Sequence, residues 1–115
     1  MVAYSSGNHA QAVAYSSLST SINAKIIMPS NAPKIKIENT KNYKANVVLY
    51  DALKESREKI GERIAKDENR TIIRPYDDYD IIAGQGTSGK EIADQLDSIS
   101  VMPVSYTHLT LPTKA

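Results

Sequence analysis

The chain has 115 residues, with 14 Lys and Arg against 13 Asp and Glu, so it is one domain at most. Its net charge of +1 favours neither nucleic acid nor a membrane surface as a partner. Cysteine is absent, the two histidines lie far apart in the sequence, and no apolar run approaches the roughly 20 residues that span a bilayer, so we expect a cytoplasmic protein without a metal site.

A run of small and polar residues follows the first residue almost at once. Residues 3–12 read Ala-Tyr-Ser-Ser-Gly-Asn-His-Ala-Gln-Ala, which is typical of the passage from a strand into a helix. Backbone amides at a helix start are unpaired and the helix dipole favours an anion there, while Ser5, Ser6 and Asn8 offer neutral polar groups. The run is therefore suited to hold a small anionic molecule. Alternatively, Asn8 is only the N-cap of the helix and Gln11 completes a capping box.

Strands alternate with helices along the rest of the chain. We predict helices at residues 10–18, 33–43, 52–68 and 82–96, and strands at residues 24–28, 46–50 and 71–74. The helix at 52–68 has the clearest pattern, because Leu53, Ile60 and Ile64 share one face. This alternation predicts an α/β fold, an open parallel sheet with flanking helices, in which ligands gather at the carboxyl ends of the strands.

A second candidate site lies in the glycine-rich segment at residues 84–90, Gly-Gln-Gly-Thr-Ser-Gly-Lys. It satisfies most of the G-x-x-x-x-G-K pattern of a phosphate-binding loop, but Glu91 stands where Ser or Thr would meet magnesium. A glycine-rich entry into the last helix is the structural interpretation. A small-ligand or nucleotide-binding module is the functional alternative, and Lys90 would be its phosphate-binding residue.

Residues 103–115 are excluded from this reasoning. Residues 103–113 read Pro-Val-Ser-Tyr-Thr-His-Leu-Thr-Leu-Pro-Thr, which resembles a translated reading frame of a transposon-end sequencing adapter. We therefore expect a non-native read-through tail at 103–115, and we give His108 no role.

Three blocks occur in order: residues 5–11, residues 28–36 with Met-Pro, Ala-Pro and Lys36, and residues 75–87 with Pro-Tyr-Asp-Asp and Ile-Ala-Gly-Gln-Gly-Thr. Together they resemble the fold-type II pyridoxal-phosphate enzymes, specifically the group of threonine/serine dehydratases (ammonia-lyases) and serine racemases. The resemblance covers residues 2–96. It implies that residues 1–79 are a small, substrate-clamping domain, incomplete at its amino end, and that residues 80–102 begin the return into the large domain.

The resemblance also implies roles for the first block. Asn8 would hydrogen-bond the ring hydroxyl oxygen of pyridoxal 5'-phosphate. Ser5 and the backbone amides around Gly7, Asn8 and His9 would hold the substrate carboxylate. Ser6 would be catalytic, because it would stand on the face of the substrate where racemases place a second acid or base. No metal ligand is implied in this chain.

The implied reaction is β-elimination from an amino acid. A lysine removes the Cα proton, the β-hydroxyl leaves, and hydrolysis of the resulting imine yields ammonia with 2-oxobutanoate from L-threonine or pyruvate from L-serine. Serine racemisation is the alternative within the family. The implied partners are a small amino-acid substrate and further copies of the parent protein in a homo-oligomer, with neither nucleic acid nor membrane.

The sequence departs from the family pattern in several places. The family's Schiff-base lysine precedes the serine-asparagine loop, whereas every lysine here follows it, and the glycine-rich phosphate loop is expected only after Met102. Ser21 and Lys44 stand where the family commonly has glycine. We therefore expect a truncated fragment that alone neither binds the cofactor covalently nor turns over substrate. A purely structural α/β fragment is the remaining alternative.

Overall fold

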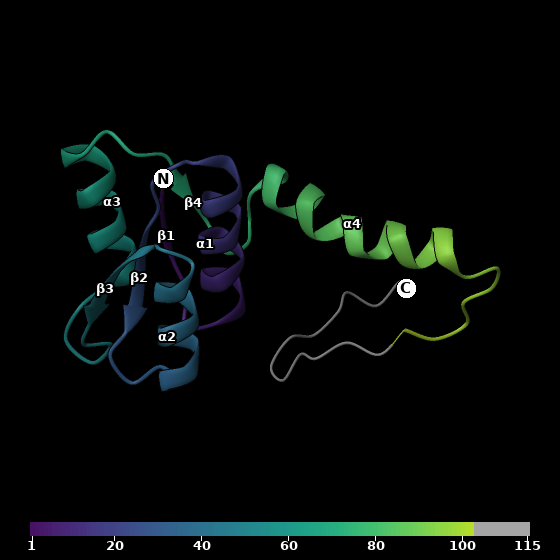
Figure 1. Cartoon of the computed structure of the whole chain (residues 1–115), viewed down its shortest axis with the longest axis horizontal. Coiled ribbons are helices and arrows are strands. Elements are labelled where there is room, and N and C mark those ends of the chain that lie inside the picture. Colours follow the sequence, from purple (N-terminus) through teal and green to yellow (C-terminus); the bar gives the residue numbers. More distant parts are fainter. Residues whose placement is uncertain (103–115) are drawn as a thin grey trace, which may run out of the picture. The chain divides into compact units, whose positions relative to one another are not determined.

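A four-stranded parallel sheet organises the first part of the chain, as the sequence predicts (Figure 1). The structure, a computed structural model, describes residues 1–102. Its strand order is β3-β2-β1-β4. The strands are β1 (Val2–Tyr4), β2 (Lys25–Pro29), β3 (Asn46–Tyr50) and β4 (Ile72–Ile73), and the helices are α1 (Asn8–Thr20), α2 (Lys34–Asn42), α3 (Arg57–Asp67) and α4 (Tyr79–Gln95).

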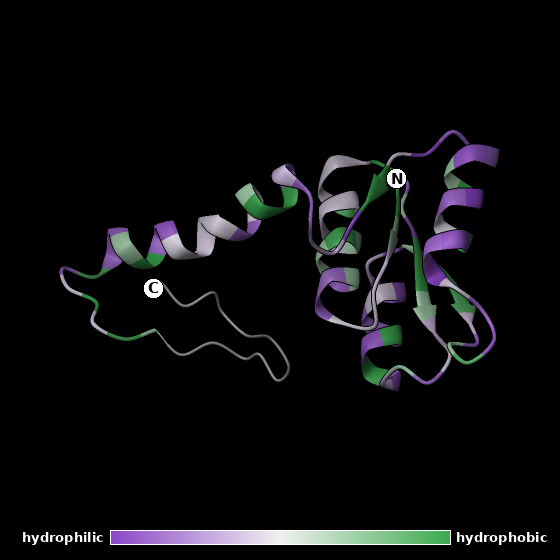
Figure 2. Ribbon diagram, turned by 180° about the vertical axis from the view of Figure 1, so that it is seen from behind, coloured by the Kyte–Doolittle hydropathy of each residue, from purple (hydrophilic) through white to green (hydrophobic). Residues whose placement is uncertain are grey.

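Helices cover both faces of this sheet, with α1 and α2 on one side and α3 on the other (Figure 1). Successive residues of a strand point to opposite faces, so Ala3 and Ile26 pack in the cluster under α1, whereas Val2 and Ile27 pack in the cluster under α3, with Ile60. Figure 2 shows the strands as the hydrophobic centre and the outer face of α3 as hydrophilic. The central strands β1 and β2 are therefore buried almost completely, whereas the outer strand β3 leaves Leu49 48% exposed.

Helix α3 starts at Arg57, so the prediction of a helix from residue 52 is wrong at its amino end. The Asp51 carboxylate accepts the amide of Leu53 at 3.0 Å, and the Ser56 hydroxyl accepts the amide three residues on at 3.4 Å as the N-cap. The Asp51 bond forms a local turn that competes with helix formation, and the Ser56 bond then fixes the start of the helix. Leu53 consequently lies in a turn, 95% exposed, and does not share the face of Ile60.

The glycine-rich segment at residues 84–90 lies inside helix α4, so both interpretations of it are wrong. Its amides belong to the helical hydrogen-bond ladder and are not available to surround a phosphate, and its glycines do not form the entry of the helix. The helix starts earlier, because the Asp78 carboxylate accepts the amides of Asp80 at 3.0 Å and Ile81 at 3.3 Å. This arrangement removes the evidence for a nucleotide-binding module.

The described chain divides into two compact units, and Met1–Ala83 forms the first. This first unit contains all four strands and the turn at residues 5–9. The expected read-through tail at 103–115 lies outside the described residues. Among residues 1–102, we find no helix that is both long and apolar enough to cross a membrane.

Candidate functional site

The turn at residues 5–9 lies where the strand order of the sheet reverses. After β1 the chain adds β2 and then β3 on one side, and it returns to add β4 on the other side of β1. In open α/β sheets, ligands bind at the carboxyl ends of the strands beside such a switch point. The turn directly follows β1, so the fold places it at this position.

Backbone and hydroxyl groups hold the turn in place. The Ser5 amide donates to the carbonyl oxygen of Ile27 at 3.1 Å, which continues the pairing of β1 with β2. The Gly7 amide donates to Oγ of Ser5 at 3.2 Å, and the Gln11 amide donates to the carbonyl oxygen of Gly7 at 3.2 Å. Because Oγ of Ser5 accepts the Gly7 amide, its own proton remains available for an acceptor outside the turn.

The capping interpretation of Asn8 is wrong. Helix α1 has Gly7 as its N-cap, and no side chain caps it. The Gln11 side chain does not return to the helix start, because its Oε1 accepts a hydrogen bond from Nδ2 of Asn39 at 3.2 Å. This bond connects α1 to α2. The Asn8 carboxamide is therefore not committed to its own helix.

The turn offers neutral donors to an anion. Ser6 and Asn8 are exposed, Ser5 and His9 are half-buried, and Gly7 is buried. The amides of the first turn of α1 have no acceptor within the helix, and the positive end of the helix dipole lies at the same place. Residues 5–9 include no carboxylate that would repel an anion. The arrangement suits a carboxylate or a ring oxygen.

His9 connects the turn to the neighbouring strand β4. Its Nε2 donates to the carbonyl oxygen of Ile73 at 3.4 Å. Burial lowers the pKa of His9 below its usual value, and the bond to Ile73 only partly opposes this effect. The imidazole is therefore neutral near pH 7. The ring links the start of α1, which follows β1, to strand β4, and the His9 amide remains part of the first turn of α1.

The structure adds Lys36 to the site. This lysine belongs to the second of the three blocks that carry the family resemblance, but the sequence assigns it no role. A Cβ atom placed on Gly7 would lie 2.7 Å from Nζ of Lys36 and 3.0 Å from its Cδ. The end of the lysine side chain therefore passes directly over the turn, although Lys36 belongs to α2. The sequence shows only the glycine at position 7 and Lys36 in the second of the three blocks, and it does not show that the two residues meet.

The residues present fit one side of pyridoxal phosphate. The exposed carboxamide of Asn8 is a neutral donor suited to the ring hydroxyl oxygen, and the unpaired amides suit a carboxylate. The described residues offer no glycine-rich loop for the phosphate, because residues 84–90 are helical. We found no group of three or more potential metal-ligating side chains in residues 1–102.

The structure brings together all five residues that the sequence predicts for the site: Ser5, Ser6, Gly7, Asn8 and His9. They form one turn at the carboxyl edge of the sheet. Their individual roles toward cofactor and substrate stay predictions. The structure adds two long-range neighbours, Ile73 and Lys36, that the sequence does not place there.

Comparison with known proteins gives a consistent result. A family model described as pyridoxal-phosphate dependent enzyme matches residues 1–111. Serine racemase of Schizosaccharomyces pombe is 44% identical over 102 residues, which cover 89% of this chain and 32% of that protein. L-threo-3-hydroxyaspartate ammonia-lyase of Saccharomyces cerevisiae is 41% identical over 102 residues, covering 89% of this chain and 31% of that protein. The chain thus spans about a third of the length of these relatives.

The solved structures agree in fold. Maize serine racemase superposes with a TM-score of 0.80 at 39% identity, over 86% of this chain and 30% of that one. This match, together with the parallel sheet, confirms the predicted fold class.

Proposed function

The chain belongs to the family of pyridoxal-phosphate-dependent enzymes, and from that premise we propose that the complete protein is an ammonia-lyase acting on L-threonine or L-serine. The observation that carries the proposal is the turn at residues 5–9, which places neutral donors at the switch point of the sheet. Relatives named serine racemase, threonine dehydratase and hydroxyaspartate ammonia-lyase support an amino-acid substrate. The domain assignment of residues 1–79 and 80–102 is part of the same proposal.

The turn would orient the substrate through its carboxylate. The Ser5 hydroxyl, which the Gly7 amide holds in place, and the amides of Asn8 and His9 would donate to the carboxylate, so it is held at several points and the Cα–H bond takes a fixed direction. Pyridoxal phosphate, when bound, supplies the electron sink that stabilises the loss of the Cα proton. Asn8 would hold its ring hydroxyl oxygen.

Racemisation is the second candidate, and one observation favours it. The Ser6 side chain is exposed at the turn, and the contacts in the described residues do not commit its hydroxyl to another group. A hydroxyl beside the substrate can give a proton to the face of Cα opposite the base that removed it. Elimination needs no such second group, so Ser6 separates the two activities.

The test measures both activities in the complete protein. It should form 2-oxo acids from L-threonine and L-serine, detected by NADH consumption with lactate dehydrogenase, and D-serine is measured by chiral chromatography. If neither these substrates nor L-threo-3-hydroxyaspartate yields a 2-oxo acid or a D-amino acid, the proposed function is wrong.

Substitution of Ser6 tests its separate role. Ser6→Ala should lower racemisation by roughly 100-fold, the usual effect of removing an acid or base, and change elimination far less. Ser16→Ala, an exposed serine on the same helix, is the control and should leave both activities unchanged. Equal losses of the two activities in Ser6→Ala would contradict the division of roles.

A further inference from the structure

The Lys36 side chain lies against the turn that the proposed function assigns to the carboxylate. Its terminal atoms Cδ, Cε and Nζ would all lie within 3.4 Å of a Cβ atom on Gly7. Gly7 has φ of −164° and ψ of −108°, and its lack of a side chain lets the end of Lys36 lie close to the turn. Lys36 is half-buried, so part of its side chain packs against the protein.

The position of Lys36 is fixed by bonds on its own helix and between helices. Its amide donates to the carbonyl oxygen of Pro33 at 2.9 Å, and its carbonyl oxygen accepts the hydroxyl of Thr40 at 2.7 Å. The bond from Asn39 to Gln11 then holds α2 against α1. The ammonium is thus presented to the turn by a supported helix and not by a loop.

No carboxylate of the described chain neutralises this ammonium. The ion pairs formed by lysines within residues 1–102 involve Lys25, Lys54 and Lys90, and none involves Lys36. The positive end of the α1 dipole lies at Gly7 as well. Two positive potentials from separate elements therefore meet at the turn, and an anion placed there would be attracted by both.

We propose that Lys36 is the charged member of the carboxylate site, and that its ammonium attracts and orients the carboxylate of the amino-acid substrate. This inference rests on the proposed function, because that function supplies the carboxylate. It explains how a turn of neutral donors binds an anion in competition with water, since charge-assisted hydrogen bonds are the stronger ones.

The direct test is to add L-serine to this chain in increasing amounts and to record the shifts of its backbone amides in ¹H–¹⁵N spectra. We expect the amides of Gly7 and Asn8 to shift, and ethanolamine, which lacks the carboxylate, to leave them unchanged. Lys36→Met keeps the aliphatic stem without the charge and should weaken binding roughly ten- to hundredfold. Lys36→Arg should bind within a few-fold of the original chain.

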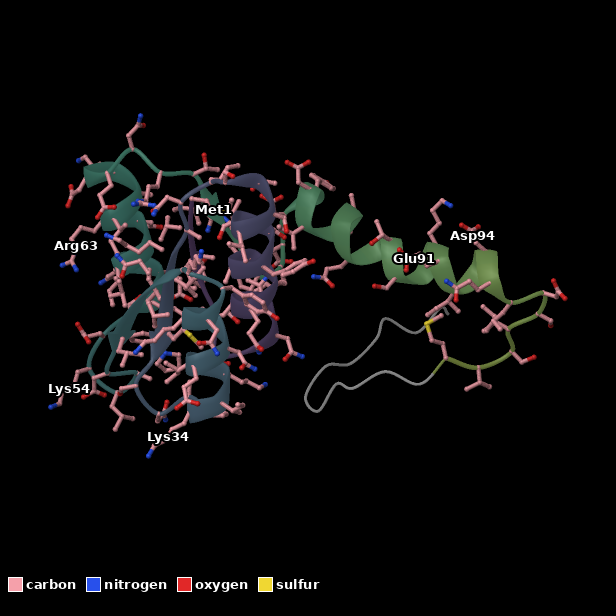
Figure 3. The ribbon with its side chains drawn as sticks, viewed as in Figure 1. Met1, Lys34, Lys54, Arg63, Glu91 and Asp94 are labelled. Carbon is pink, nitrogen blue, oxygen red and sulfur yellow. The ribbon has the colours of Figure 1, made fainter. Side chains whose placement is uncertain are left out.

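Lys34→Met is the matched control. Lys34 lies on the same helix and points away from the protein (Figure 3), so its loss should change binding little. Raising the salt concentration should weaken the binding of L-serine by the original chain and by Lys34→Met more than its residual binding by Lys36→Met, which retains only the helix dipole. A merely structural role of Lys36 would not produce this difference in salt dependence.

Two results would overturn the inference: equal binding by the original chain and Lys36→Met, or no shift of Gly7 and Asn8 with L-serine. Neither result would contradict the proposed function, which is tested separately by the formation of 2-oxo acids in the complete protein. In that protein, Lys36→Met should mainly raise KM and change kcat less, because the charge acts on the bound carboxylate.

Discussion

The two edges of the sheet are held by different kinds of contact. At the amino edge, Glu68 pairs with Lys25 and Arg70, each at 2.5 Å, and Nη1 of Arg70 also donates to Oδ1 of Asn23 at 2.7 Å. At the carboxyl edge, the turn at residues 5–9 takes part in none of the five ion pairs found in residues 1–102. The amino edge satisfies its own charges, whereas the carboxyl edge leaves donors for a ligand. The amino ends of the strands thus contribute ion pairs to stability, and their carboxyl ends provide the donors for binding.

Removal of Arg70 should break the amino edge without changing the carboxyl edge. Arg70→Ala removes the bonds to Asn23, to Glu68 and to the carbonyl oxygen of Met1, and should lower the free energy of unfolding by about 1–2 kcal/mol. Urea denaturation followed by far-UV circular dichroism measures this change. Arg63→Ala, which removes an outward-pointing arginine of α3 (Figure 3), is the control and should cost less than about 0.5 kcal/mol.

The same variant tests whether the edges are independent. In Arg70→Ala, the L-serine-induced shifts of Gly7 and Asn8 should match those of the original chain. A loss of these shifts under conditions where the variant remains folded would show that the two edges are coupled.

Two turns at the amino edge should gain stability from glycine. Ser21, which ends α1, has φ of 57°, and Lys44, which precedes β3, has φ of 61°. A side chain is strained in this left-handed region, so Ser21→Gly and Lys44→Gly should each raise the free energy of unfolding by roughly 0.5–1 kcal/mol. Ser16→Gly in the interior of α1 is the matched control and should lower it by a similar amount.

Both variants alter the amino edge alone, so they test whether its stability affects binding at the carboxyl edge. Carboxylate binding should remain unchanged in both. If Ser21→Gly is as destabilising as Ser16→Gly, the left-handed conformation at Ser21 is wrong.

Most of the fold follows from local patterns. The bounds of β3 agree with the prediction at both ends, because its β-branched residues Val47 and Val48 lie between polar segments. The start of α3 was missed, because Asp51 and Ser56 form local side-chain bonds that a hydrophobic pattern does not show. The start of α4 was missed for the same reason at Asp78.

The site could be predicted only as far as it is continuous in the sequence. Residues 5–9 form one turn, so their placement together was available from the pattern. The contacts of Gly7 with Lys36 and of His9 with Ile73 join residues 29 and 64 positions apart (36 − 7 and 73 − 9). They depend on how α2 packs on α1 and on β4 returning beside β1. Spacing along a single chain carries no information about either relation.

His9 gives the smallest predicted change in stability, and it is the one stability prediction that concerns the carboxyl edge. Burial lowers the pKa of His9 in the folded chain, so the unfolded chain binds a proton more readily. The contribution of neutral His9 to stability is present above about pH 6.5, the pKa of histidine in the unfolded chain. It is lost as the pH falls through the lower pKa that His9 has in the folded chain. The free energy of unfolding should therefore decrease from about pH 8 to about pH 5.

His9→Gln keeps a donor for the carbonyl oxygen of Ile73 but cannot titrate, so the decrease should be smaller in this variant. The carboxyl groups of Glu58 and Glu68, whose pKa values are lowered by hydrogen bonds and neighbouring charges, lose their stabilising effect only at more acidic pH. The difference between the original chain and His9→Gln over this range is therefore due to the imidazole. If the two pH profiles are parallel, His9 is not buried beside Ile73 as the structure shows.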